Sequence, residues 1–68
     1  MDFLEKARIR LTHWISHSEQ HVKEYEAFSS ELEAAGKAEG AGFIKEMAEL
    51  TRKSTDCLRN ALKAIEKD

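Results

Sequence analysis

The sequence predicts an all-α protein, an antiparallel helical hairpin that pairs with a second copy to form a four-helix bundle. Three observations carry this prediction. The 68 residues include no proline, the three glycines fall between residues 36 and 42, and apolar residues recur at spacings of three and four on both sides of that window. Such spacing is typical of amphipathic helices, and the glycines indicate a turn between them. We expect one domain over residues 1–68.

The first helix is predicted over about residues 3–35. Asp2 followed three residues later by Glu5 matches a capping box, in which a side-chain oxygen accepts from a free N–H at the helix start. Gly36 tolerates positive φ and is expected to end the helix. The predicted core stripe comprises Leu4, Ala7, Leu11, Trp14, Ser18, His21, Tyr25, Phe28, Leu32 and Ala35.

The second helix is predicted over about residues 40–67, with a core stripe at the same spacings. This stripe comprises Phe43, Ile44, Met47, Leu50, Thr51, Ser54, Leu58, Ala61, Leu62 and Ile65. The opposite face is charged and is expected to face solvent. It carries Lys45, Glu49, Arg52, Asp56, Arg59 and Lys63.

A chain of this length is expected to need help to fold. A 60-residue domain hides only about 60% of its unfolded surface when it folds alone, and one cysteine excludes an internal disulfide. A metal or a partner subunit remains. Ile15 and Val22 lie beside the predicted stripe of the first helix, and Ile9 lies further round. A second hairpin would cover them, so we expect a homodimer.

Composition argues against several classes of protein. Charged residues make up 35% of the chain, but the formal net charge is only −2 and the signs are interleaved, so no basic stripe invites nucleic acid. No apolar run approaches the roughly 18 residues of a membrane span, and the first residues lack the pattern of a signal peptide. A lone cysteine fits a reducing compartment. We therefore expect a cytoplasmic protein with no nucleic-acid or membrane partner.

All three histidines lie in the stretch THWISHSEQH, each four residues after the last. A spacing of four advances about 40° around a helix, so His13, His17 and His21 form a slanting row. His21 is predicted within the apolar stripe, His17 at its edge and His13 toward solvent. Two imidazoles at this spacing can chelate a transition metal. We predict a site for Zn²⁺, Ni²⁺, Co²⁺ or copper at His17 and His21, with His13, Glu24 or Cys57 as further ligands.

The second helix is expected to bring polar residues opposite these histidines. With a turn near residues 37 to 39, His21 faces Ser54 or Cys57, and Ser18 faces Cys57 or Leu58. Such a belt across the bundle is either a hydrogen-bonded device that fixes the register of the helices or a binding site. The belt comprises Ser18, His21, Thr51, Ser54 and Cys57.

Other functions remain open at this point. His21 is alternatively a hydrogen-bonded core residue beside two solvated histidines, or a ligand to haem or another cofactor. Cys57 is alternatively an inert buried residue. Without a metal, the protein is a structural or adaptor module that presents helix faces to a protein partner. An enzyme is not predicted, because the sequence shows no nucleophile and base pair, phosphate loop or acid pair at useful spacing.

The run from Leu11 to His21, followed by an acidic and aromatic stretch and a glycine turn, resembles short uncharacterised prokaryotic helical-hairpin proteins that carry H-W-x-x-H-N-x-x-H. Ser18 stands where that motif has asparagine. The resemblance covers most of the chain in pattern and the histidine run in motif. It implies a helical hairpin and strengthens the metal hypothesis, but it implies no substrate.

Overall fold

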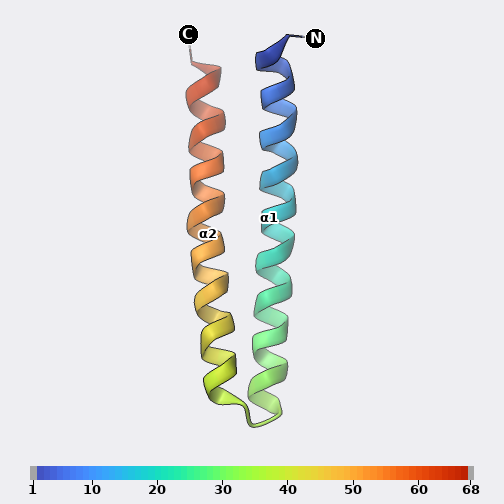
Figure 1. Cartoon of the computed structure of the whole chain (residues 1–68), viewed down its shortest axis with the longest axis vertical. Coiled ribbons are helices and arrows are strands. Elements are labelled where there is room, and N and C mark those ends of the chain that lie inside the picture. Colours follow the sequence, from blue (N-terminus) through green and yellow to red (C-terminus); the bar gives the residue numbers. More distant parts are fainter. Residues whose placement is uncertain (1, 68) are drawn as a thin grey trace.

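The computed structural model describes residues 2–67 and consists of two long α-helices joined by a tight turn (Figure 1). Helix α1 spans Phe3–Ala34 and α2 spans Ala38–Glu66. The helices run antiparallel side by side, so both ends of the chain lie at the same end of a rod with Cα extents of 51 × 17 × 10 Å. The predicted all-α hairpin is confirmed, and each helix boundary lies within two residues of its predicted position.

Both predicted signals at the ends of α1 are confirmed. The side chain of Asp2 accepts a hydrogen bond from the backbone N–H of Glu5 at 2.8 Å. At the other end, Gly36 takes a positive φ of 78°. The N–H of Lys37 then donates to the carbonyl of Leu32 at 2.9 Å, which satisfies one of the free carbonyls of the last turn.

The helices meet along a seam of buried and half-buried side chains at alternating spacings of three and four. Its most buried members are small: Ser29, Ala41 and Ala48 are each 1% exposed, and Thr55 is 2% exposed. Small side chains let two helix backbones approach closely. The seam comprises Leu11, Ile15, Ser18, Val22, Tyr25, Ser29 and Leu32 from α1, with Ala41, Ile44, Ala48, Thr51, Thr55, Leu58, Leu62 and Ile65 from α2.

The predicted core face of α1 is wrong by one position around the helix. Trp14 and Phe28, placed in the core by the sequence, are each 48% exposed in the hairpin. Ile15 and Val22, placed beside the core, lie in the seam instead. A narrow seam explains this difference, because a branched aliphatic side chain fits opposite an alanine where an indole or phenyl ring does not.

The core of α2 is displaced in the same way. Phe43, Met47 and Leu50 remain exposed, while Ala41 and Ala48 are buried in their place. Large apolar side chains thus stay at the surface of the single hairpin. No helix within residues 2–67 has both the length and the apolar character needed to cross a membrane.

The positive φ of Gly36 gives a test of the turn. We expect Gly36→Ala to lower the free energy of unfolding by about 1 kcal/mol, because a Cβ disfavours the left-handed backbone conformation. Gly42→Ala is the matched control, since a Cβ at Gly42 lies within a helix and meets nothing within 4 Å. It is expected to stabilise the fold by about 0.5–1 kcal/mol. Urea denaturation of both variants measures this, and equal effects would contradict the assigned turn.

Candidate functional site

One flank of the seam is lined by ion pairs between the helices, which we name the charged flank. Lys45 Nζ lies 2.8 Å from Glu33 Oε1, Arg52 pairs with Glu26, and Arg59 pairs with Glu19. Each step of seven residues forward along α1 is matched by seven residues back along α2, as expected for antiparallel helices. The charged flank comprises Glu19, Glu26, Glu33, Lys45, Arg52 and Arg59.

This arrangement corrects the prediction that Lys45, Arg52 and Arg59 face only solvent. They flank the contact between the helices, and each carries an opposite charge to its α1 partner. The signal was present in the sequence as two heptad series of opposite sign. Since all these side chains are about half exposed, each pair contributes at most about 1 kcal/mol. Their main effect is to favour one register of the hairpin over others.

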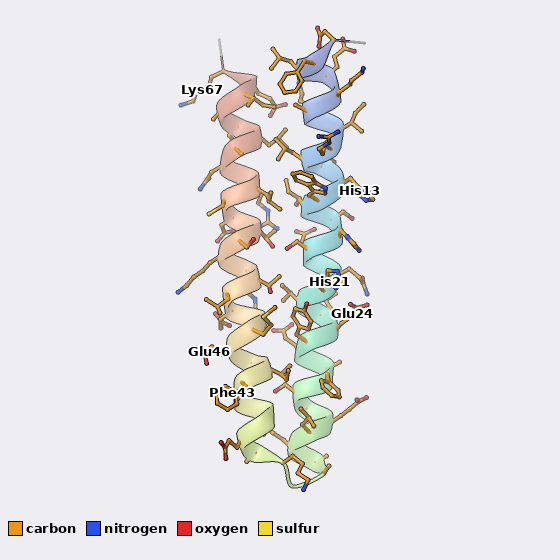
Figure 2. All side chains as sticks on the ribbon, in the orientation of Figure 1. His13, His21, Glu24, Phe43, Glu46 and Lys67 are labelled. Atoms are coloured by element: carbon orange, nitrogen blue, oxygen red, sulfur yellow. The ribbon has the colours of Figure 1, made fainter. Side chains whose placement is uncertain are left out.

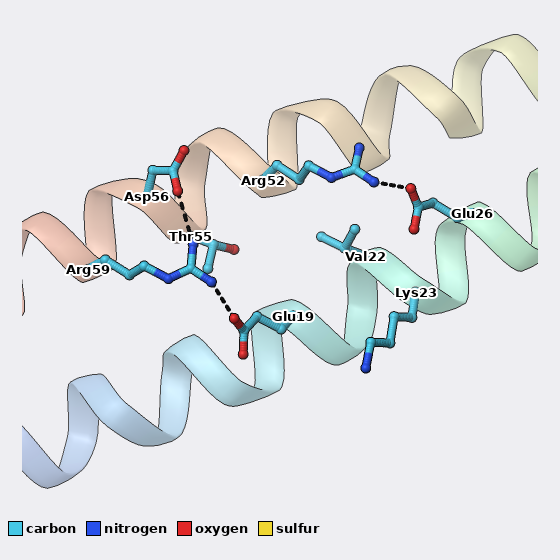
Figure 3. Close-up of a pocket in the computed structure, with 8 residues that line it drawn as sticks. All are labelled: Glu19, Val22, Lys23, Glu26, Arg52, Thr55, Asp56 and Arg59. Carbon is cyan, nitrogen blue, oxygen red and sulfur yellow. Dashed lines mark hydrogen bonds and ion pairs between the residues drawn. The ribbon is translucent and has the colours of Figure 1, made fainter.

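A shallow groove of about 430 Å³ runs along the charged flank (Figure 3). Its arginines and carboxylates are paired within the chain: Arg59 bonds Asp56 at 2.9 Å as well as Glu19, and Arg52 bonds both Glu49 and Glu26. No cysteine or histidine lines it, and its one hydroxyl side chain belongs to the seam. Its lining residues are Glu19, Val22, Lys23, Glu26, Arg52, Thr55, Asp56 and Arg59.

A pair of hydroxyls joins the helices at the middle of the seam. Ser18 Oγ lies 2.5 Å from Thr55 Oγ1, and Thr55 Oγ1 donates to the carbonyl of Thr51 at 2.8 Å. Because a threonine hydroxyl has one hydrogen, Ser18 must be the donor to Thr55. This short chain of hydrogen bonds satisfies polar groups that are buried or half-buried, and it stabilises one register of the two helices over others.

A second serine bonds across the seam near the turn. Ser29 Oγ donates to the carbonyl of Ala41 at 3.0 Å, and this bond is buried. Within residues 2–67, no buried side-chain nitrogen or oxygen lacks a hydrogen-bond partner. The buried polar groups of the seam thus bond within the hairpin and hold the helices together.

The predicted polar belt is only partly correct. Ser18 does bond across the seam, but its partner is Thr55, which the sequence reading missed, and neither Cys57 nor Leu58. Ser54 and Cys57 are exposed. The hydroxyls that do meet therefore form hydrogen bonds between the helices, which was the first of the two interpretations that the sequence left open. The histidines take no part in these bonds.

The histidine row lies on the outer surface of α1, and Figure 2 shows that His13 and His21 do not reach across to α2. The ring centroids of His17 and His21 are 4.6 Å apart, while those of His13 and His17 are 5.8 Å apart. The side chain of His21, predicted to be a core residue opposite Ser54 or Cys57, is 43% exposed in the single hairpin. The slanting row of rings is as predicted.

The further predicted ligands do not converge on one point. Glu24 Oε1 lies 3.0 Å from His21 Nδ1, so Glu24 contacts one of the two predicted main ligands. Cys57 lies on α2 and is exposed. Among residues 2–67, no group of three or more histidine, cysteine, aspartate or glutamate side chains is arranged to hold a metal ion.

The flank opposite the ion pairs carries most of the large exposed apolar side chains, together with several polar ones. Glu19 and Arg52, which lie on the charged flank, each come directly after a seam residue in the sequence. A residue that comes directly before a seam residue therefore lies on the opposite flank. Both helices expose large apolar side chains there, between 45% and 65% exposed. We define the apolar flank by these side chains: Trp14, Phe28, Phe43, Met47 and Leu50. His21 and Ser54 lie at its middle.

One of the comparisons with known proteins identifies a family. The family described as Domain of unknown function (DUF8180) matches residues 7–65. The chain belongs to the DUF8180 family. The match covers both helices and the turn, so the DUF8180 domain contains both flanks and the histidine row. No curated protein and no solved structure matches the chain.

The bond between Ser18 and Thr55 gives a test of the seam. We expect Thr55→Val to lower the free energy of unfolding by about 1–3 kcal/mol, because the buried Ser18 hydroxyl loses its acceptor. The double variant Ser18→Ala with Thr55→Val is expected to recover part of this loss, since no partner is then left unpaired.

Thr51→Val is the matched control for Thr55→Val. Its hydroxyl bonds only the carbonyl of Met47 in its own helix, at 2.8 Å, so its loss is expected to cost about 0.5 kcal/mol or less. Chemical denaturation of the three variants at one protein concentration measures these differences. Equal losses for Thr51→Val and Thr55→Val would contradict a register fixed by the hydroxyl pair.

Proposed function

We propose that this chain is a helical interaction module that works as a homodimer. The apolar flank of one hairpin packs against the apolar flank of a second copy, which completes a four-helix bundle. The observation that carries this proposal is the exposure of large apolar side chains from both helices on one flank, while ion pairs occupy the other. Exposed apolar patches of this kind mark interaction surfaces.

The surface area of the hairpin supports a partner of its own size. A globular monomer of 7.8 kDa is expected to expose roughly 4,400 Å², but the hairpin exposes 5264 Å². Its broad face, 51 by 17 Å between Cα atoms, offers on the order of 850 Å², about the area that one partner buries in a stable complex. One further hairpin is thus enough to cover the flank.

The layout of the apolar flank favours a second copy over an unrelated partner. His21, Ser54 and Leu50 lie near the middle of their helices, with Trp14 toward one end of the hairpin and Phe28, Phe43 and Met47 toward the other. When two copies stack, the middles meet each other and the apolar ends meet each other. The net charge of −2 per chain adds little repulsion.

The fuller role is that of a structural or adaptor module whose bundle presents its charged outer faces to another protein. Lys and Glu side chains project from both helices on the faces that the dimer leaves free. The exposed free thiol of Cys57 fits work in a reducing compartment such as the cytoplasm. The core histidine of the predicted bundle, His21, then lies at the contact between the two copies.

Self-association gives the direct test of this function. We expect sedimentation equilibrium of the untagged protein to give twice the mass of the 7.8 kDa chain. The variant Phe28→Glu with Met47→Glu is expected to sediment as a monomer, because charges are costly to bury in an apolar contact. Circular dichroism should show that this variant keeps its helices, since neither residue lies in the seam.

Ala27→Glu is the matched control, because Ala27 is exposed on the side of α1 away from the seam. This variant is expected to remain a dimer. A wild-type chain that stays monomeric at millimolar concentration would overturn the proposal, and so would a double variant that dimerises as tightly as the wild type. A monomer that binds an unrelated protein would contradict the dimer but would be consistent with the adaptor role.

A further inference from the structure

We propose that His17 and His21 form a binding site for a divalent transition metal ion, with Glu24 as the residue that orients His21. The site goes beyond the proposed dimer and does not depend on it, because every residue belongs to α1 of one chain. Imidazole nitrogen suits Cu²⁺, Ni²⁺ and Zn²⁺. Two histidines one helical turn apart supply two ligands, and water completes the coordination.

The spacing of the rings selects this pair within the row. The centroids of His17 and His21 are 4.6 Å apart, which lets one nitrogen of each ring bond a shared ion at about 2.0–2.1 Å. The centroids of His13 and His17 are 5.8 Å apart, so that pair must move its side chains further to reach one ion. Both pairs have the same spacing in sequence, and the structure distinguishes them.

The carboxylate of Glu24 is the second feature that distinguishes His21 from His13. Its Oε1 lies 3.0 Å from Nδ1 of His21, so Nδ1 is held as the protonated nitrogen and Nε2 is left free for a metal. A carboxylate bonded to the outer nitrogen of a ligating histidine fixes the ring and increases its basicity. Among residues 2–67, His13 makes no such contact with a carboxylate. The negative charge of Glu24 also lowers the cost of placing a cation beside it.

In the single hairpin, the site is open to solvent and close to a spectroscopic probe. His17 is exposed, and the side chain of His21 is 43% exposed, so an ion reaches both rings without opening the hairpin. Tyr25 stacks on the far side of His21 with centroids 5.9 Å apart, which restricts the motion of that ring. Trp14, the single tryptophan of the chain, precedes His17 by three residues and therefore lies on a neighbouring turn.

The test is titration of the untagged protein with Cu²⁺ at pH 7.5, followed by quenching of Trp14 fluorescence and by calorimetry. We expect one ion per chain, removed by excess EDTA, and weaker binding of Ni²⁺ than of Cu²⁺. Glu24→Gln is expected to weaken binding about tenfold, the lower end of the effect of an outer-shell partner. His21→Ala is expected to weaken it more, because a ligand itself is lost.

The matched comparison is His13→Ala against His21→Ala. Each variant removes one histidine and leaves one pair spaced by four residues, so composition and charge are equal. We expect wild-type affinity in His13→Ala and a loss in His21→Ala. Equal affinities in the two variants, a larger loss in His13→Ala, or no saturable binding by the wild type would each overturn the site. Circular dichroism of the variants excludes unfolding as the cause.

The test of metal binding and the test of dimerisation give separate answers. A protein that binds one Cu²⁺ per chain and sediments as a monomer would retain the metal site and contradict the proposed dimer. A dimer that binds no metal would do the reverse. Sedimentation with and without Cu²⁺ separates the two outcomes in one experiment.

Discussion

The close approach of the two helices at small side chains is the constraint on which the rest of the structure depends. Ser29, Ala41 and Ala48 are almost completely buried because the facing backbone leaves room for little more than a methyl or hydroxyl group. That limit excludes aromatic rings from the seam. It also aligns Ser18 with Thr55 and brings the opposite charges of the charged flank within reach of each other. Packing, hydrogen bonds and charge therefore favour the same register.

A seam of small residues has a consequence for the surface. The large apolar side chains that a larger protein would bury have no place between the helices, so Trp14, Phe28 and Met47 remain exposed on one flank. The two flanks therefore differ in chemistry. The charged flank consists of ion pairs within the chain, whereas the apolar flank exposes apolar surface that nothing in the hairpin covers. Association through the apolar flank supplies the core that a chain of 68 residues lacks. The histidine row reaches that flank at His21 and continues through His17 and His13 onto the exposed surface of α1.

Sequence patterning predicted the helices, the Asp2 cap and the Gly36 turn, because each depends on local chemistry within a few residues. It failed on which face of α1 meets α2. Leu11, Ser18 and Leu32 belong to both candidate stripes, so hydrophobic spacing alone fits Trp14 and Ile15 about equally well. The choice depends on residues far away in sequence, the alanines of α2 and its cations, whose effect appears only once the two helices are aligned. For the same reason the sequence placed Cys57 where Thr55 lies.

Seam residues should contact only their own hairpin, whereas residues of the apolar flank should contact a second copy. An isotope-filtered nuclear Overhauser experiment on mixed labelled and unlabelled protein measures this difference directly. The account predicts contacts between copies from Trp14, Phe28 and Met47, and contacts only within a chain from Val22 and Ala48. Contacts between copies from Val22 and Ala48, with none from the apolar flank, would contradict it.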